Sequence, residues 1–118
     1  MEIFIVSTIE AAHRLPHLPE GHRCGRLHGH SFRLEIHAAG PMDEAAGWVM
    51  DLADIHTAFQ PLFDQLDHRY LNDIPGLENP TGEHIARWIW TRLKPNLPGL
   101  SKIVVQEQCT SGCVYRGE

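Results

Sequence analysis

The stretch CGRLHGH, residues 24–30, places one cysteine and two histidines within seven positions. His28 and His30 stand two residues apart, so both imidazoles point to the same face if the following strand extends back to them. If a first strand ending near His13 pairs with this segment as a hairpin, His13 lies opposite the pair. Three neutral imidazoles with one open position are a common catalytic zinc arrangement. The spacing therefore predicts a metal centre at His13, His28 and His30.

Cys24 has two interpretations on the residues alone. As a fourth metal ligand it would close the site and make it structural. As a thiol beside the metal it would be free to react, because a nearby metal and cationic neighbours lower the pKa of a thiol. Arg23 and Arg26 flank it, which fits the second interpretation without excluding the first.

Asp67 and His68 adjoin the end of a helical segment, in LDHRYLN. The carboxylate could orient the imidazole for proton transfer. The alternative is an ordinary helix end, where a histidine interacts favourably with the C-terminal dipole.

Glu107 falls on the more apolar face of a predicted strand, together with Ile103 and Val105. A buried charge is costly there unless it has a partner. The carboxylate could accept two N–H groups from a planar heterocycle, and the alternatives are an exposed strand end or an arginine partner. The nearby Cys109 and Cys113 are interpreted as incidental thiols of a turn.

Four strands and two helices must position these groups, because the hydrophobic period alternates between two and about 3.6 residues. The predicted strands are residues 3–12, 31–38, 102–109 and a short one around 114–115, and the predicted helices run from 51 to 66 and from 81 to 93. Asp51 and Thr81 are the expected N-caps. Pro61 should kink or divide the first helix.

This order of elements predicts an α+β fold, with a four-stranded antiparallel sheet and two helices on one face. Because the edges of such a sheet stay open, side-by-side oligomerisation is expected. A length of 118 residues suggests a single domain, residues 1–118.

Composition narrows the class of protein further. The net charge of −5 argues against a nucleic-acid-binding surface, and no apolar run approaches the ~18 residues of a membrane span. Three cysteines and a start without a signal-peptide pattern favour a cytoplasmic location.

Several separated motifs, in one order, resemble the 6-pyruvoyl-tetrahydropterin synthase superfamily from near residue 10 to the C-terminus. They are EAAHRLP, CGRLHGH, GWVMDLADI, LDHRYLND, ENPTGEHIA and VQEQCTSGCVYRGE. The tight CxxxHxH spacing favours the branch that makes a 6-carboxy-tetrahydropterin over the pyruvoyl-forming branch. The resemblance implies that zinc is held by His13, His28 and His30, and that Cys24 is the catalytic base.

The same resemblance implies that Asp67 and His68 are partners of the base in proton transfer and that Glu107 anchors the pterin ring. Thr81, in NPTGE, lies where the family builds its pterin pocket. The implied fold is the tunnelling fold, in which the sheets of several subunits assemble into a barrel. The implied assembly is a homohexamer, a dimer of trimers with active sites between subunits, in which Asp67 and His68 serve the Cys24 of a neighbouring subunit.

The implied activity is a carbon–carbon lyase reaction of queuosine biosynthesis that needs no nicotinamide or flavin. It converts 7,8-dihydroneopterin triphosphate to 6-carboxy-5,6,7,8-tetrahydropterin, acetaldehyde and triphosphate. One alternative is a pyruvoyl-forming or sepiapterin-cleaving enzyme on the same fold. Others are a zinc hydrolase that does not need Cys24 and a structural zinc domain with Cys24 as fourth ligand.

Overall fold

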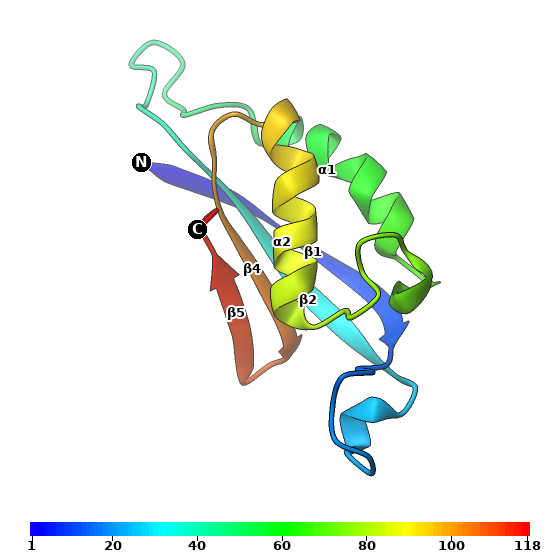
Figure 1. Ribbon diagram of the computed structural model, residues 1–118. Helices are drawn as coiled ribbons and strands as arrows, with labels where there is room; N and C mark the ends of the chain where they lie inside the picture. Colours follow the sequence, from blue (N-terminus) through cyan, green and yellow to red (C-terminus); the bar gives the residue numbers. More distant parts are fainter.

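The computed structural model describes residues 1–118 as a curved sheet with two helices packed against it (Figure 1). The strands run in the order β3-β1-β2-β4-β5 across the sheet. Their bounds are β1 (Glu2–His13), β2 (His28–Ala39), β3 (Arg69–Tyr70), β4 (Leu100–Gln108) and β5 (Ser111–Tyr115). The helices are α1 (Leu52–Leu66) and α2 (Gly82–Leu93), with short 3-10 turns η1 (Arg23–Gly25), η2 (Leu71–Asp73) and η3 (Lys94–Asn96).

The α+β class and the four antiparallel strands are confirmed, but the sheet has a fifth strand that the sequence did not predict. β3 pairs in parallel with β1 at Ala11 and Ala12. β3 has only two residues, both exposed, so the sequence has no hydrophobic alternation from which this strand could be predicted.

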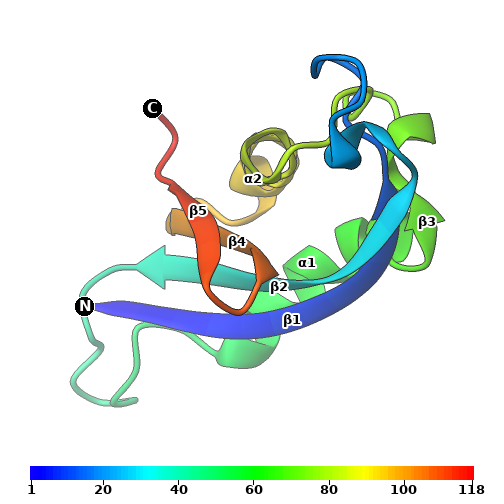
Figure 2. The same ribbon diagram turned by 90° about the horizontal axis from the view of Figure 1, so that it is seen from below.

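The β1–β2 hairpin positions the histidines as the spacing predicted. Its antiparallel register pairs His13 with His28 and Ala11 with His30. The strand does extend back to His28, so both imidazoles of β2 continue the inward row that begins with Phe32. Figure 2 shows the curvature of the two strands, with loop 14–27 beside the segment that precedes α2.

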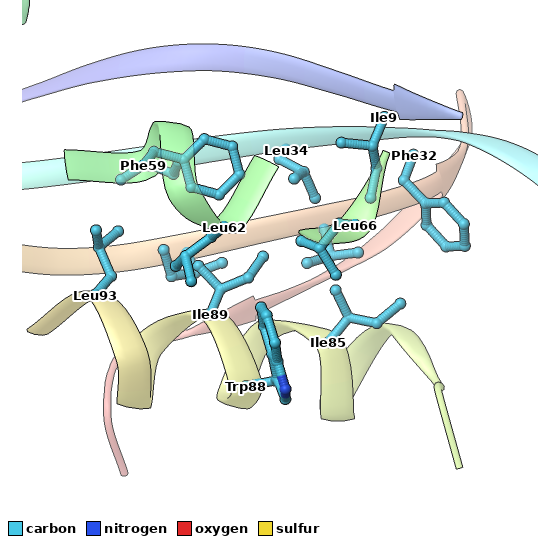
Figure 3. Close-up of a cluster of buried hydrophobic side chains, with 14 of the residues drawn as sticks. Ile9, Phe32, Leu34, Phe59, Leu62, Leu66, Ile85, Trp88, Ile89 and Leu93 are labelled. Atoms are coloured by element: carbon cyan, nitrogen blue, oxygen red, sulfur yellow. The ribbon is translucent and has the colours of Figure 1, made fainter. Parts of the chain in front are cut away.

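Both helices bury one apolar stripe against the inner face of the sheet, as Figure 3 shows. Asp51 and Thr81 cap them as predicted, because their side chains accept N–H bonds from Ala53 at 2.9 Å and His84 at 3.1 Å. Pro61 does not divide α1, which continues to Leu66. Neither helix is long and apolar enough to cross a membrane.

The opposite face of the sheet carries a charged network around His37. Its ring stacks on Phe4 with centroids 4.7 Å apart and lies between two carboxylates, with Nε2 2.8 Å from Glu35 and Nδ1 3.4 Å from Glu2. His37 is therefore buried although it lies on the polar face. The hydrogen bond from Arg33, followed by that from His37, holds the pKa of Glu35 below its usual value.

Candidate metal centre and active site

Three imidazoles converge at the end of the β1–β2 hairpin. One nitrogen from each of His13, His28 and His30 lies within 4.8 Å of the others. The ring centroids are 4.5 to 5.1 Å apart, and the rings meet edge to face. Such a cluster of imidazole nitrogens suits a transition-metal ion.

The hydrogen bonds of two rings select the nitrogen that could bind a metal. His13 Nδ1 donates to the Pro80 carbonyl at 2.8 Å, and His28 Nδ1 donates to the Arg26 carbonyl at 2.7 Å. In the neutral form of either ring, this bond places the proton on Nδ1 and leaves Nε2 free to act as a ligand.

His13 is fully buried, and its Nε2 has no hydrogen-bond partner. Because an unsatisfied buried acceptor is costly, a metal ion bound at this atom would supply the missing partner. Burial also lowers the pKa of His13, which keeps the ring neutral as a ligand must be. The donor set of this structure therefore fits a metal.

Cys24 lies near this centre in sequence, but it does not join the group of converging donors. It belongs to the turn η1, is half-buried, and donates its backbone N–H to His22 Nδ1 at 3.1 Å. Its carbonyl accepts from Leu15 N–H at 2.9 Å, which ties the turn to the end of β1. The cluster contains the three histidines and not this thiol, which favours the interpretation of Cys24 as a reactive group over that as a fourth ligand.

Asp67 and His68 form a pair at the outer edge of β1. The Asp67 carboxylate accepts from Glu10 N–H at 2.9 Å and from His68 Nδ1 at 2.7 Å. These bonds, that from Glu10 first, hold the pKa of Asp67 below its usual value. The His68 side chain is 77% exposed, and its ring bonds to Asp67 and not to Cys24.

Glu107 lies on the inner face of β4, as the sequence pattern predicted, and this position brings it beside the histidine cluster. Its Oε2 is 3.9 Å from His30 Nε2, and its side chain is 33% exposed. It lines a hollow of about 270 Å³ together with Gly82, Ser111 and Cys113, among others. A half-buried carboxylate without an arginine partner is therefore open to a ligand in this hollow.

Cys113 differs from the sequence-based expectation, whereas the expected role of Thr81 at the pterin pocket stays a prediction. Cys113 lies in β5 and not in the turn, and it is half-buried against the hollow, which raises the pKa of its thiol. Thr81 does not line this hollow; its side chain caps α2, and its neighbour Gly82 lies there instead. The β4–β5 pairing that opposes Cys113 to Val105 produces this arrangement.

A family model described as 6-pyruvoyl tetrahydropterin synthase matches residues 2–118. The chain belongs to the 6-pyruvoyl tetrahydropterin synthase family. Its fold is accordingly the tunnelling fold of this family. A solved 6-pyruvoyl tetrahydropterin synthase from Caenorhabditis elegans superposes with a TM-score of 0.91 at 25% identity, over 100% of this chain and 96% of the other.

Two curated relatives in this family carry different activities in their names. The 6-carboxy-5,6,7,8-tetrahydropterin synthase of Synechocystis is 46% identical over 114 residues, which cover 92% of this chain and 87% of the relative. The dihydroneopterin monophosphate aldolase of Pyrococcus furiosus is 43% identical over 77 residues, which cover 65% of this chain and 64% of the relative.

Two groups of the candidate site in this family member carry no sequence signal. They are the carbonyls of Arg26 and Pro80, which orient the rings of His28 and His13. Every residue has a backbone carbonyl, so the residue type at these positions does not predict the contact. The proline of NPTGE is a hint only in retrospect, because it is the backbone oxygen that makes the contact.

Proposed function

We propose that the protein is a 6-carboxy-5,6,7,8-tetrahydropterin synthase that acts on 7,8-dihydroneopterin triphosphate. Its products would be 6-carboxy-5,6,7,8-tetrahydropterin, acetaldehyde and triphosphate. The observation that carries this proposal is the 46% identity to the Synechocystis enzyme across 92% of the chain. The histidine cluster and the adjacent Glu107 supply the chemistry that such a reaction needs.

Glu107 is the proposed anchor of the pterin ring. A pterin presents a ring N–H and an amino group side by side, and a carboxylate can accept from both at once. The hollow beside Glu107 has room for a planar ring because Gly82 contributes no side chain to it. A ring held there would direct its side chain towards the neighbouring His30.

Zinc is the proposed metal, held by Nε2 of His13 and His28 and by a ring nitrogen of His30. Three imidazoles and no carboxylate are a donor set that zinc accepts readily. When bound, zinc would supply Lewis-acid polarisation of the substrate side-chain oxygens. The carbonyls of Pro80 and Arg26 hold two of the rings in the tautomer that this requires.

Cys24 and the Asp67–His68 pair are the proposed proton-transfer groups. The Cys24 thiolate would accept a proton from a side-chain carbon of the substrate. His68 donates its Nδ1–H to Asp67, so its Nε2 is the atom that can accept or return a proton to a side-chain oxygen. Asp67 stays ionised because its pKa is lowered, and it can stabilise the imidazolium that forms.

The proposed assembly is a dimer of trimers in the cytoplasm, with Asp67 and His68 of one protomer completing the site of the next. The exposure of His68 supports this, because a catalytic imidazole that is 77% exposed in the single chain needs a partner surface to enclose it. The outer edges of β1 and β5 lack a neighbouring strand over most of their length. The proposed biological role is in queuosine biosynthesis.

The test is an incubation of the zinc-loaded protein with 7,8-dihydroneopterin triphosphate, followed by identification of the products. Acetaldehyde in equal amount to a 6-carboxy-tetrahydropterin supports the proposal. One water must be consumed, because the new carboxyl group needs a second oxygen, so ¹⁸O from labelled water should appear in it. A 6-pyruvoyl product without acetaldehyde, or intact substrate, would refute the proposal.

An aldolase is the second candidate, because the Pyrococcus relative is named for dihydroneopterin monophosphate. Retro-aldol cleavage of that substrate would give a hydroxymethyl-dihydropterin and glycolaldehyde phosphate. The ring would then remain at the dihydro level, whereas the synthase reaction yields a tetrahydropterin. The monophosphate and the triphosphate, assayed in parallel, separate the two candidates by both aldehyde and ring oxidation state.

A further inference from the structure

Asn72 lies in the turn η2, where the chain leaves the edge of the sheet. Just before it, β3 pairs in parallel with β1, Arg69 opposite Ala11 and Tyr70 opposite Ala12. If β3 continued, Asn72 would lie opposite Arg14. The backbone turns away instead. The Asn72 side chain makes the hydrogen bonds to β1 that the backbone of a longer β3 would have made.

The side-chain amide of Asn72 brackets the backbone of Arg14. Its Oδ1 accepts from Arg14 N–H at 2.9 Å, and its Nδ2 donates to the Arg14 carbonyl at 2.7 Å. A strand would make the same two kinds of bond with its own backbone. The backbone is therefore held on both sides of His13, at Ala12 by its pairing with β3 and at Arg14 by the side-chain amide of Asn72.

A third bond from the same amide reaches the segment that orients the His13 ring. Nδ2 also donates to the Glu78 carbonyl at 3.3 Å. Two residues later, the buried Pro80 carbonyl accepts the Nδ1–H of His13 at 2.8 Å. One half-buried amide thus contacts both the backbone that carries this ring and the segment that selects its tautomer.

We propose that Asn72 is a positioning residue for the metal centre, acting through His13 and the Pro80 carbonyl. Only an amide serves here, because the position needs one acceptor and two N–H donors in the same plane. Aspartate has the same shape, but its carboxylate would face the carbonyls of Arg14 and Glu78 without a proton to donate. The role of Asn72 rests on the proposed metal site and is independent of the reaction assigned to it.

The test compares Asn72→Asp and Asn72→Ala with the wild-type protein in a Zn²⁺ competition titration against a chromophoric chelator. Loss of a hydrogen-bond partner behind a ligand histidine weakens metal binding by about 10-fold or more. We expect a loss of that size in both variants. With Co²⁺ in place of Zn²⁺, the visible absorption bands should shift, because the donor geometry around the ion changes.

Two control variants separate positioning from general destabilisation. Asn96→Asp makes the same chemical change at an exposed residue with no side-chain hydrogen bond, and its metal affinity should equal that of the wild type. Ile55→Val trims the core in the first turn of α1 and should lower the unfolding temperature without changing metal affinity. The unfolding temperature of each metal-free variant shows that it is folded.

Two outcomes would overturn the proposal, and they are distinguishable. If the folded Asn72 variants bind Zn²⁺ as the wild type does and give its Co²⁺ spectrum, Asn72 does not position His13. If the wild-type protein itself binds no Zn²⁺, the metal site fails and this role of Asn72 fails with it.

Discussion

His68 is the only residue other than glycine with a positive φ, 59°, and its side chain is 77% exposed. A non-glycine residue in this region costs about 1–3 kcal/mol and persists only when its surroundings fix it. Glu10 does so, because its carbonyl accepts His68 N–H at 2.6 Å and its own N–H binds the Asp67 carboxylate. Backbone strain at an outward-facing imidazole is typical of a functional position.

Cys24 is the residue whose role is tested most directly by substitution. We expect Cys24→Ser to lower kcat by about 10³-fold, because a hydroxyl is a far weaker base than a thiolate at neutral pH. Its zinc content should equal that of the wild type, since Cys24 is outside the ligand cluster. Steady-state kinetics and metal analysis check both expectations.

Cys109→Ser is the matched control for this substitution. Cys109 is an exposed thiol in the turn after β4, so its loss should leave kcat and zinc content unchanged. Loss of zinc from Cys24→Ser would instead indicate that the thiol is a ligand and that the site is structural.

The clustering of the three histidines was predictable because strand periodicity and hairpin register are properties of the sequence pattern. His28 and His30 follow from a period of two, and His13 from the pairing of two adjacent strands. Cys113 was not predictable as part of the Glu107 hollow. Its placement depends on how β5 pairs across the irregularity between Val105 and Gln108.

The N-terminus of α2 forms one wall of the hollow, and Gly82 controls how much room it leaves. A Cβ built there would lie 3.7 Å from Cys113 Sγ and 3.8 Å from Glu107 Oε1, which are ordinary contacts. Gly82→Ala should therefore fold normally and gain up to about 1 kcal/mol of helix stability. The added methyl should lower kcat/KM by about tenfold, mainly through KM.

Gly40→Ala provides the control for this change. It adds the same methyl beyond the end of β2, where the nearest atom is the Val49 side chain at 3.4 Å. Thermal unfolding and kinetics of the two variants together test whether the effect belongs to the hollow. Equal KM values for both would show that the substrate does not occupy it.

The network on the outer face of β2 gives the sheet a pH-dependent contribution to stability. The pKa of Glu35 is lowered from 4.5, so its carboxylate stabilises the fold above that value, and the effect is lost as pH falls through the lowered pKa. Glu35→Gln should therefore cost about 1 kcal/mol of unfolding free energy at neutral pH, because Arg33 is partly screened by solvent. The difference should be lost at an acid pH below the lowered pKa of Glu35.

Urea unfolding at the two pH values measures this difference. Glu20→Gln is the control, because Glu20 is exposed in loop 14–27 and should give the same stability as the wild type at both. A Glu35→Gln deficit that persists in acid would point to lost packing and not to charge.

The elements that sequence reasoning missed are those stabilised only by the folded neighbourhood. β3 exists because the turn at His68 lays two residues along β1, and neither residue has a strand-forming pattern of its own. Pro61 was expected to kink or divide α1, and it does not divide it. The helix continues because Phe59, Leu62 and Leu66 on both sides of the proline pack into the same core.

The proposed assembly can be tested by complementation between two inactive variants. If Asp67 and His68 complete the site of a neighbouring protomer, Cys24→Ala and His68→Ala chains should complement one another when mixed. Random association in equal amounts leaves about a quarter of the sites with both groups intact. Activity after dissociation and reassembly of the mixture measures this, with each variant alone as the inactive control.

A site contained within one chain would give no recovery in that mixture. Light scattering of the same samples should report six chains per particle. A monomer that retains full activity would contradict the shared site, because its exposed His68 would then have no partner surface.

Residues 78–84 make contact with both halves of the candidate site. Pro80 binds His13, and Gly82 borders the hollow beside Glu107. If a first ligand orders this segment further, a second ligand meets a lower entropic cost, and the two sites would be coupled without any change of shape. Thermodynamic reciprocity then requires that the metal ion raise the affinity for the pterin by the same factor as the pterin raises that for the metal. The affinity of the protein for its metal would then be highest while the pterin is bound and lowest when substrate is scarce.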